Sequence, residues 1–396
     1  MKNKRIVGIL IENYIAGGCD KIAADLIDNL EYEKMYLFTN KEADLKFVQR
    51  SDKYSNIEVV TYNVKSLHML GVTANRYKNR NKFLYLFFKL RNLFLRYPLM
   101  IFFTFYFIFL FKKYKINIFF SNNGGYPGGE CNRMATMAFS FFKGKNYHIV
   151  HNLATKPFFI LFTYIEYFVD YLLDKRSTFI CVSQQTKEFL QNNRNIKNNP
   201  VVIYNGIKNN DISEKKPNKG TIKLLNVGLL GERKDQLFII NVLHLLKSKG
   251  YEKIELYLLG EEEDIGYKKK LIDTINKYNL SNIYFEGFCD PKHYYSMCDI
   301  FLLSSKVESF ALVRVEAMSH QLPVITTDVG DAHLQIENAH SGYIINTEKE
   351  MATKIEEYIE NRNLIIEHGN HGYEIFKNRF TMKKMIDQYQ KLIDGE

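Results

Sequence analysis

Short apolar runs alternate with stretches of helical periodicity along most of the chain. Seven runs in the N-terminal half have the length and composition of buried strands. They are Arg5–Ile11, Met35–Thr39, Ile57–Tyr62, Ile116–Ser121, His148–His151, Phe179–Ser183 and Val201–Tyr204. The C-terminal half repeats the pattern, with strands expected near Ile222, Ile254, Ile283, Ile300, Val324 and Tyr343. Strand–helix alternation of this kind predicts parallel sheets with helices on both faces.

A polar segment near the middle of the chain separates the two halves. Asn205-Gly206 is followed by a run at 208–220 that includes Pro217 and contains few apolar side chains. A chain of 396 residues can supply two domains, each with its own core. We therefore expect an α/β protein with two Rossmann-like domains of doubly wound parallel sheet, over residues 1–206 and 207–372, and a C-terminal helix within 373–396.

Composition is that of a globular protein, with 46% hydrophobic and 25% charged residues. The five cysteines form no CxxC motif and no His–Cys cluster with zinc spacing, which favours a reducing compartment and argues against a structural metal. The basic N-terminus is followed by a short apolar run, Ile6–Ile11, and then by Glu12. This run is too short for a signal peptide, so we expect it to be the first strand of the mature chain.

Positive charge is concentrated in one part of the N-terminal half. The formal net charge is +10, and eleven Lys and Arg residues lie between Lys65 and Lys115, whereas residues 59–129 contain no Asp or Glu. Very apolar, aromatic sequence fills the same region at Phe83–Phe88 and Leu99–Phe111. Basic residues that flank apolar sequence suit an anionic membrane surface better than a nucleic-acid groove. We expect peripheral contact with an anionic membrane and no nucleic-acid partner.

The apolar stretch at 99–111 leaves three structural alternatives open. A transmembrane helix needs about 20 apolar residues, and this run supplies thirteen before Lys112 and Lys113. Upstream, Pro98 and Arg96 interrupt the pattern. The length favours a long helix buried against the N-terminal sheet over a true span. Partial insertion into the membrane interface is the third alternative.

Two glutamates spaced as E-x7-E form the most informative motif. Glu308 follows the apolar strand expected at 299–305, and Glu316 lies in a stretch with helical spacing. Glu308 would then occupy the loop and Glu316 would lie two turns along the helix. We expect this helix to begin near Ser309 at the carboxyl edge of the sheet, where a phosphate can dock on free backbone N–H groups. The N–H groups in question belong to Phe310, Ala311 and Leu312.

These elements, in this order, resemble the retaining glycosyltransferases of family 4, which have the GT-B fold. The resemblance is strongest over residues 221–345. It includes the strand and glycine turn at 224–235, the second strand at 254–260, the loop at 285–288 and the strand and turn at 322–330. It implies two Rossmann-like domains that face each other across a cleft, an N-terminal acceptor domain and a C-terminal donor domain. It also implies that the last helix crosses back onto the N-terminal domain.

The resemblance assigns donor-binding roles to residues of the C-terminal half. Lys234 matches the diphosphate lysine of the family and follows the turn glycine, Gly228. Glu308 would bind hydroxyls of the donor sugar and Glu316 those of the ribose, because a carboxylate can accept from two vicinal hydroxyls at once. Phe288 lies in the loop that the family places beside the base.

One position departs from the family pattern. The family usually has an arginine directly after the turn glycine, but Leu229 stands there, and Arg233 is the available substitute. Surface Lys and Arg are common, so Arg233 and Lys234 could instead be solvated cations at a helix start. Glu316 could likewise be an ordinary surface residue.

Two glycine-rich loops and a histidine are the candidates in the N-terminal half. Gly17-Gly18 resembles the turn before the first helix of the family, where backbone amides approach the phosphates and the acceptor. The loop at 121–130 would form part of the acceptor wall. His151 ends an expected strand, and the ends of parallel strands face the ligand crevice; it matches a histidine often found in family active sites. Alone, each signal is weak, because glycine pairs are common in loops and a lone histidine is more often structural.

The same residues imply a reaction without metal or cofactor. No D-x-D motif occurs, so protein groups would neutralise the diphosphate. No pair of residues has the pattern of a nucleophile with an acid/base, which agrees with the front-face retaining mechanism of the family, in which the leaving phosphate takes the acceptor's proton. Glu308, His151 and Lys234 are then the candidate catalytic residues, acting by positioning and electrostatics.

The expected reaction transfers a hexosyl or N-acetylhexosaminyl group from a nucleotide diphosphate sugar, taken to be UDP-linked, to a lipid-linked or growing surface polysaccharide of the capsule or lipopolysaccharide. The expected location is cytoplasmic, at the inner face of the cell membrane. Two alternatives stay open. One is a nucleotide-sugar epimerase with the same fold. The other is a catalytically silent GT-B subunit that partners another glycosyltransferase at the membrane, which the leucine at 229 favours.

Overall fold

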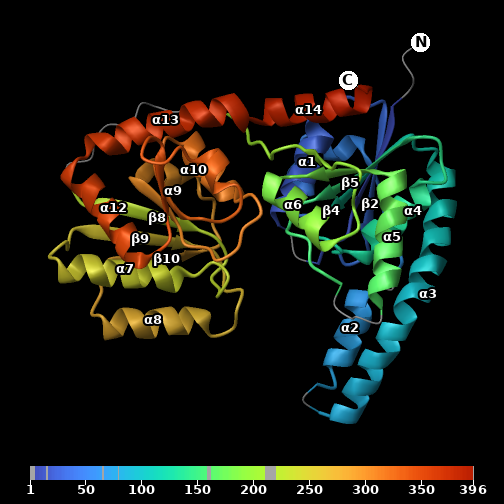
Figure 1. The fold of residues 1–396 in the computed structure, drawn as a ribbon, viewed down its shortest axis with the longest axis horizontal. Coiled ribbons are helices and arrows are strands. Elements are labelled where there is room, and N and C mark those ends of the chain that lie inside the picture. The colour runs from blue at the N-terminus through green and yellow to red at the C-terminus, as the bar shows by residue number, and fades with distance from the viewer. Residues whose placement is uncertain are drawn as a thin grey trace. The chain divides into compact units, whose positions relative to one another are not determined.

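The chain folds as two compact units, each built on one parallel β-sheet (Figure 1). The computed structural model describes residues 5–14, 17–64, 67–78, 80–157, 162–209 and 220–395. Met1–Ile203 together with Ile386–Glu396 form the N-terminal unit, and Tyr204–Met385 form the C-terminal unit.

The N-terminal unit contains a seven-stranded sheet in which every strand pair is parallel. The strands are β1 (Ile6–Ile11), β2 (Lys34–Asn40), β3 (Glu58–Tyr62), β4 (Ile118–Asn123), β5 (Lys145–Val150), β6 (Thr178–Cys181) and β7 (Val201–Val202). Their order is β3-β2-β1-β4-β5-β6-β7, so the direction of winding reverses between β1 and β4. Ligands of open α/β sheets bind at such a switch point, outside the carboxyl ends of the strands.

Helices cover both faces of this sheet, because successive strand residues point to opposite sides. On one face, Phe119 packs against Phe111 of α3 (Lys82–Tyr114) and close to Phe139 of α4 (Glu130–Phe139). On the other face, Phe120 contacts Tyr389 of α14 (Met382–Asp394). The remaining helices are α1 (Gly18–Asn29), α2 (Leu67–Asn75), α5 (Thr163–Arg176), α6 (Gln184–Asn193) and the 3₁₀ turns η1 (Val48–Arg50) and η2 (Tyr54–Asn56).

The C-terminal unit contains a six-stranded parallel sheet. The strands are β8 (Ile222–Val227), β9 (Ile254–Leu259), β10 (Ile283–Gly287), β11 (Ile300–Leu303), β12 (Val324–Thr327) and β13 (Gly342–Ile345). Their order, β10-β9-β8-β11-β12-β13, places the switch point between β8 and β11. The loops that follow these two strands therefore border the expected ligand position.

The helices of the C-terminal unit bury apolar stripes against the sheet. Leu224 and Leu256 of the strands share a core with Ile240 of α7, Leu271 of α8 and Ile355 of α12. The helices are α7 (Gln236–Ser248), α8 (Tyr267–Lys277), α9 (Lys292–Met297), α10 (Leu312–Ser319), α11 (Ala332–Gln335), α12 (Glu348–Glu360) and α13 (Asn363–Arg379).

The structure confirms the two doubly wound parallel sheets, and each expected strand is present with small shifts at its ends. The largest shift is in β5, which begins at Lys145 rather than at His148, and β4 runs on to Asn123, which brings two asparagines into that strand. The unit division falls after Ile203 rather than after Gly206, because the Tyr204 ring packs on Phe310 and Phe380 of the C-terminal unit. The C-terminal return segment groups with the N-terminal unit only from Ile386 onward, not from residue 373. Most of the expected linker, residues 210–219, lies outside the described residues.

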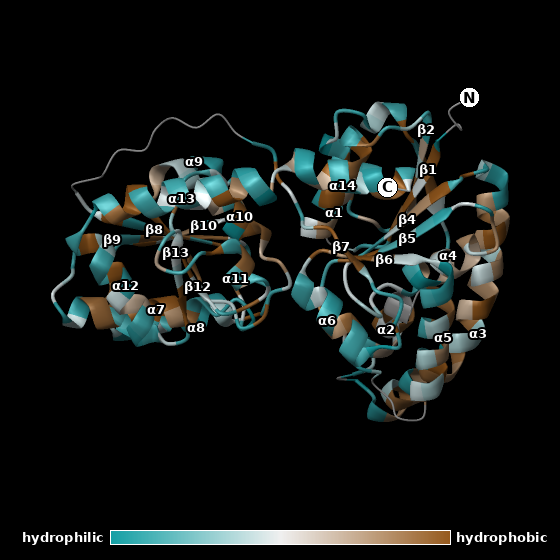
Figure 2. Ribbon diagram, turned by 45° about the horizontal axis from the view of Figure 1, so that its top comes forward, coloured by the Kyte–Doolittle hydropathy of each residue, from teal (hydrophilic) through white to brown (hydrophobic). Residues whose placement is uncertain are grey.

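The long apolar helix α3 differs most from expectation. It is continuous through Pro98 and spans 33 residues, but its buried residues are only Met100, Phe107 and Phe111. The expectation of a buried helix is therefore wrong: one side of α3 packs against the core, partly through half-buried residues, and the opposite side exposes large apolar residues. Figure 2 shows how many residues of α3 are apolar, in brown. By length and composition, α3 is the one helix in the described part of the chain that could cross a membrane. Its length does not exclude a span, contrary to the argument from residues 99–111.

Candidate active site

Two charged residues meet at the switch point of the C-terminal sheet. Lys234 lies in the turn that follows β8, and Glu308 lies in the loop that follows β11, the neighbouring strand. The Lys234 Nζ atom is 2.5 Å from Glu308 Oε1, and the two side chains are 13% and 9% exposed. The structure thus brings together the two residues that the sequence named as the centre of the donor site.

The Glu308 carboxylate is held ionised by its surroundings. Burial alone would raise its pKa, but the Lys234 ammonium and the hydrogen bonds from Lys234 and Ser305 hold the pKa of Glu308 below its usual value of 4.5. The Ser305 hydroxyl donates to Glu308 Oε1 at 2.8 Å. Arg233 adds a longer contact, at 3.8 Å between Nη1 and Oε1. The arginine expected as a substitute for the missing family residue does therefore extend round the turn to Glu308.

Backbone contacts fix the loop that carries Glu308. Ser304 donates from its hydroxyl to the Lys234 carbonyl at 3.0 Å, and Lys306 N–H donates to the Arg233 carbonyl at 2.9 Å. On the other side, the Thr327 hydroxyl donates to the Ser305 carbonyl at 2.7 Å. Hydrogen bonds therefore hold the Glu308 loop to the turn after β8 and to the end of β12, and these contacts fix the position of Glu308.

Two glycines let backbone segments approach closely at this edge. Gly330 has φ +61°, and a Cβ there would lie 3.0 Å from the Ser309 carbonyl oxygen. Gly228 has φ +157°, and the Lys234 side chain runs over its Cα, with Cε 3.4 Å from the place of a Cβ. The glycine turn therefore provides the space in which Lys234 lies.

The helix after the motif loop starts later than expected. α10 begins at Leu312 rather than near Ser309, because Ala311 adopts the left-handed conformation with φ +59° and forms the N-cap. No side chain caps this N-terminus by a hydrogen bond. Glu316 is consequently the fifth residue of the helix, little more than one turn from its start rather than two. Phe310 and Ala311 are loop residues, and only Leu312 belongs to the helix.

Glu316 is half-buried and held from a neighbouring helix. The Tyr295 hydroxyl of α9 donates to Glu316 Oε2 at 3.0 Å, and the Tyr295 ring is fully buried. His320, one turn further along α10, stacks on that ring at 5.0 Å and contacts the Glu316 carbonyl. An ordinary surface glutamate has no such support, so the structure favours a specific role for Glu316.

Arg314 is a buried residue that the sequence did not point out. Its side chain is inaccessible to solvent, donates to the Val329 carbonyl at 3.0 Å and contacts the Thr326 hydroxyl at 3.3 Å. Burial lowers the pKa of Arg314 to about 10, although Glu308 and Asp331 oppose the shift. It joins α10 to the turn after β12, behind the motif loop. In sequence it looks like one more helix arginine, and only the packed structure identifies it.

Phe288 lies in a solvated position. It follows Gly287, the last residue of β10, and its side chain is 66% exposed. Gly287 has φ +66°, and its carbonyl accepts from Gly260 N–H at 2.8 Å at the end of the neighbouring strand β9. An exposed ring beside a strand end provides a stacking surface.

The two glycines expected in the turn of the N-terminal unit lie at the start of α1. Gly17 is the N-cap of α1, Gly18 is its first residue, and the Gly17 N–H donates to Asp20 Oδ2 at 2.8 Å. A Cβ added to Gly17 would meet no atom within 4 Å, and its φ of −147° is open to any residue. Among the described residues, neither packing nor backbone geometry requires glycine at 17.

His151 lies at the same edge of the N-terminal sheet. It follows β5, is 7% exposed, and its Nε2 is 2.7 Å from Asn122 Oδ1. The Asn122 amide donates to the Cys19 carbonyl, which leaves Oδ1 to accept from His151. Nε2 therefore carries the proton, and Nδ1 is an acceptor. Burial lowers the pKa of His151 to about 4, so the ring is neutral at neutral pH.

Glu12 is a second residue that the sequence did not assign. It follows β1 directly and accepts from Cys131 N–H at 2.9 Å and from the Tyr14 hydroxyl at 3.3 Å. Burial, reinforced by the Glu130 carboxylate, raises the pKa of Glu12 to about 7. A Cβ at Gly129 would lie 2.6 Å from Glu12 Oε2, so that glycine makes room for the carboxylate. The signal in the sequence, a Glu directly after the first strand, is too common to single out.

Metal-binding groups do not cluster in the described part of the chain, where no set of three or more His, Cys, Asp or Glu residues is placed to hold an ion. The five cysteines form no disulfide. The cations that the structure places beside Glu308 are Lys234 and Arg233.

Comparisons with known proteins show which proteins the chain resembles. Residues 207–374 match the family described as glycosyl transferases group 1. The chain is 27% identical over 256 residues to the capsular polysaccharide biosynthesis glycosyltransferase CapM of Staphylococcus aureus, a match that covers 57% of this chain and 65% of CapM. It is 29% identical over 207 residues to the O-antigen biosynthesis glycosyltransferase WclY of Escherichia coli, covering 49% of this chain and 55% of WclY. The matched region thus spans less than two thirds of either relative.

One solved structure matches nearly the full length of the chain. The Anabaena protein Alr3699/HepE in complex with UDP superimposes with a TM-score of 0.75 over 99% of this chain and 100% of that protein, at 18% identity. The same protein has also been solved with UDP-glucose. These likenesses show the two-domain GT-B fold, and the family match covers residues 207–374, most of the C-terminal unit.

Proposed function

We propose that this protein is a glycosyltransferase that uses a nucleotide diphosphate sugar to extend a bacterial surface polysaccharide. The Lys234–Glu308 pair at the switch point between β8 and β11 is the observation that carries the proposal. The named relatives act in capsule and O-antigen biosynthesis, which supports the class of product. The complexes of the Anabaena protein with UDP and UDP-glucose support a UDP-linked donor.

The donor site combines a cation for the diphosphate with two carboxylates for hydroxyls. Lys234, with Arg233 beside it, offsets the negative charge of the diphosphate, so no metal ion is needed. Glu308 stays ionised beside Lys234 and accepts hydrogen bonds from donor-sugar hydroxyls. Glu316 accepts from the ribose hydroxyls. The backbone N–H groups of the motif loop and of the α10 N-terminus, from Phe310, Ala311 and Leu312, face the same phosphates.

The N-terminal unit supplies the acceptor side. The Gly17-Gly18 turn would face the acceptor, and the neutral His151 offers Nδ1 as an acceptor for a sugar hydroxyl. In the retaining reaction, the bond between the anomeric carbon and the phosphate oxygen breaks and the diphosphate leaves with the electron pair. The acceptor oxygen forms the new bond on the same face, and its proton passes to the leaving phosphate oxygen. The sugar is a hexosyl or N-acetylhexosaminyl group, and the acceptor is lipid-linked, at the cytoplasmic face of the membrane.

A catalytically silent subunit is the second candidate, because Leu229 replaces the usual cation after Gly228 and its side chain is 39% exposed. The close Lys234–Glu308 contact favours the enzyme, since a silent subunit has no need to hold an ionised carboxylate beside a buried lysine.

Complementation of polysaccharide synthesis distinguishes the two. In cells that lack the gene, Lys234→Met and Glu308→Gln should each abolish the polymer, whereas Lys306→Met, which alters a 56% exposed lysine of the same loop, should restore it. All three proteins should be present at equal levels by immunoblot. Full rescue by Lys234→Met or Glu308→Gln would establish the silent subunit instead.

A further inference from the structure

The outer side of α3 carries a continuous stripe of exposed apolar side chains. Its members are spaced three, four or seven residues apart, which places them on one side of a helix. They are Phe83, Phe87, Leu90, Phe94, Ile101, Phe105 and Phe109, with Leu86 and Phe102 at its edges. At 1.5 Å per residue the stripe is about 39 Å long. Single exposed apolar residues are ordinary, but a row of this length on a soluble surface indicates an interaction.

The helix α5 extends this surface. Tyr164, Phe168 and Tyr171 are 84%, 59% and 41% exposed and follow one another at helical spacing, while Glu166 and Asp170 on the other side of α5 are buried. α5 lies beside α3, as Figures 1 and 2 both show, and the Phe94 ring contacts the Phe162 ring just before α5. Two neighbouring helices therefore present aromatic residues together.

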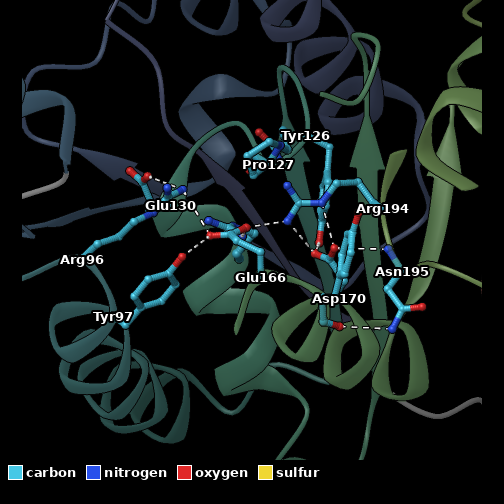
Figure 3. Close-up of polar contacts among 12 residues, drawn as sticks. Arg96, Tyr97, Tyr126, Pro127, Glu130, Glu166, Asp170, Arg194 and Asn195 are labelled. Carbon is cyan, nitrogen blue, oxygen red and sulfur yellow. Dashed lines mark hydrogen bonds and ion pairs between the residues drawn. The ribbon is translucent and has the colours of Figure 1, made fainter. Parts of the chain in front are cut away.

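A buried ion network fixes α3 to the body of the N-terminal unit (Figure 3). Glu166 of α5 pairs with Arg133 of α4 at 2.7 Å and with Arg194 at 2.5 Å, and it accepts from the Tyr97 hydroxyl of α3 at 3.0 Å. Arg96, also on α3, is 3.3 Å from Glu130 at the start of α4. Burial would raise the pKa of Glu166, but Arg133 and Arg96 lower it to about 2, so the network stays charged at neutral pH.

The network and the core contacts determine how α3 can meet a bilayer. Met100, Phe107 and Phe111 are packed in the unit's core, and Arg96 and Tyr97 are tied to α4 and α5. A helix that crossed the bilayer would have to withdraw these residues from the core and expose buried charges to hydrocarbon, which is costly. Only the outer stripe is available to lipid. This geometry corresponds to a helix that lies in the interface rather than across it.

The charges around the stripe identify the kind of membrane. Residues 59–129 contain eleven Lys and Arg and no Asp or Glu. Two cations of these helices lie over aromatic rings: Arg91 of α3 over Phe88 at 4.7 Å, and Lys175 of α5 over Tyr171 at 4.6 Å. Each cation near an anionic lipid surface contributes about 1 kcal/mol of attraction. A second copy of this chain would bring the same positive charge to the contact and be repelled.

We propose that the outer side of α3, with the exposed residues of α5, docks in the plane of an anionic bilayer and inserts its aromatic rings into one leaflet. The inference goes beyond sugar transfer and does not depend on the donor site, which lies in the other unit. It adds α5 to the surface that the sequence indicated and excludes a transmembrane course for α3.

Vesicle binding tests the surface. Purified full-length protein should sediment with vesicles of phosphatidylglycerol and phosphatidylcholine, and roughly tenfold less with phosphatidylcholine alone. Phe102→Ser/Phe105→Ser/Phe109→Ser, which changes residues that are 58–73% exposed, should lower binding to the anionic vesicles by at least roughly tenfold. Lys112→Gln/Lys113→Gln should weaken only the anionic component. Ile265→Ser, at a fully exposed apolar residue of the C-terminal unit, is the matched control and should bind as the wild type does.

Insertion depth separates docking from spanning. The chain has no tryptophan, so Phe105→Trp or Tyr164→Trp introduces a single reporter, with Ile265→Trp as control. With anionic vesicles, the first two should shift their emission to the blue and be quenched more by bromines near the headgroup than by bromines near the chain end. Stronger quenching from the chain end at Phe105→Trp would indicate a spanning helix and overturn the proposal.

Two further results would also overturn it. One is equal vesicle binding by the triple serine variant and the wild type. The other is a dimer, seen by sedimentation velocity, that the triple variant dissociates while the wild type shows no vesicle binding. Each variant should match the wild type in urea unfolding and in stabilisation by nucleotide. A loss of vesicle binding can then be assigned to the surface rather than to misfolding or to a damaged donor site.

Discussion

Separating the Lys234–Glu308 ion pair tests whether the two residues act as one unit. The charged atoms are 2.5 Å apart, and the side chains are 13% and 9% exposed. Lys234→Met removes the cation and leaves Glu308 with the Ser305 hydroxyl at 2.8 Å and Arg233 at 3.8 Å. Glu308→Gln keeps the shape and an acceptor for Ser305, but leaves the ammonium without its carboxylate.

The size of the effect follows from which charge is left unpaired. Removing one partner of a buried pair costs about 3–5 kcal/mol. Because Ser305 and Arg233 still compensate Glu308, we expect Lys234→Met to lower the free energy of unfolding by about 2–3 kcal/mol. Glu308→Gln should cost about 1–2 kcal/mol, since the lysine head can turn to water. The double variant leaves neither charge unpaired, so the coupling energy between the two substitutions should be about 1–3 kcal/mol.

Urea unfolding of the four proteins, followed by circular dichroism at pH 7, measures that coupling. The exposed Lys270–Glu232 pair, at 2.7 Å with side chains 47% and 56% exposed, provides the control cycle. Its substitutions to Met and Gln should be additive within about 0.5 kcal/mol. Because Lys234 holds the pKa of Glu308 below 4.5, its contribution is present above that pH and is lost as the pH falls through the folded-state pKa. Additive effects at Lys234 and Glu308 at pH 7 would refute the reasoning.

Three further predictions concern Glu316, Glu12 and Gly330. Glu316→Gln should weaken UDP binding by roughly tenfold and abolish the preference for UDP over 2′-deoxy-UDP in calorimetric titration; a retained preference would mean that Glu316 does not read the ribose. Burial and Glu130 raise the pKa of Glu12 to about 7, so the folded state favours its protonated form and loses stability as the pH rises from about 4.5 to 7. Glu12→Gln should therefore gain stability over the wild type between pH 5 and pH 8 in urea unfolding, and a constant difference would contradict this. Gly330→Ala should lower the free energy of unfolding by roughly 1–2 kcal/mol, plus the strain of the contact between its Cβ and Ser309, and should weaken UDP binding. Gly250→Ala is the control, because Gly250 has φ +88° and no atom lies within 4 Å of the added Cβ, so only the backbone cost should appear. Equal losses of unfolding free energy in the two variants would show that the Ser309 contact is unimportant.

Local sequence patterns predicted most of the fold because parallel strands buried on both faces leave continuous apolar runs. The same logic placed Lys234 and Glu308 together, since each follows a central strand and the carboxyl ends of such strands share one edge of the sheet. The exact start of α10 was not predictable, because it depends on the left-handed backbone conformation of Ala311, and an alanine gives no sign of that conformation in the sequence.

Long-range contacts account for what the sequence did not indicate. Arg314 and Tyr295 acquire their roles only through burial beside β12 and Glu316, and a helix arginine or tyrosine has no pattern that marks this. Glu12 is assigned by its approach to Cys131, 119 residues away. For α3, hydrophobicity predicted burial, but only Met100, Phe107 and Phe111 are fully buried, and the apolar residues on the opposite side of the helix are exposed.

Calorimetric titration of the purified protein with UDP, GDP, dTDP and CMP in the presence of EDTA is the most direct test of the donor site. We expect one nucleoside diphosphate, UDP, to bind at a single site without a metal ion. Lys234→Met should weaken this binding by roughly tenfold or more, while Lys306→Met should leave it unchanged. Absence of binding by any of the four nucleotides, or binding that Lys234→Met does not alter, would contradict a donor site between β8 and β11.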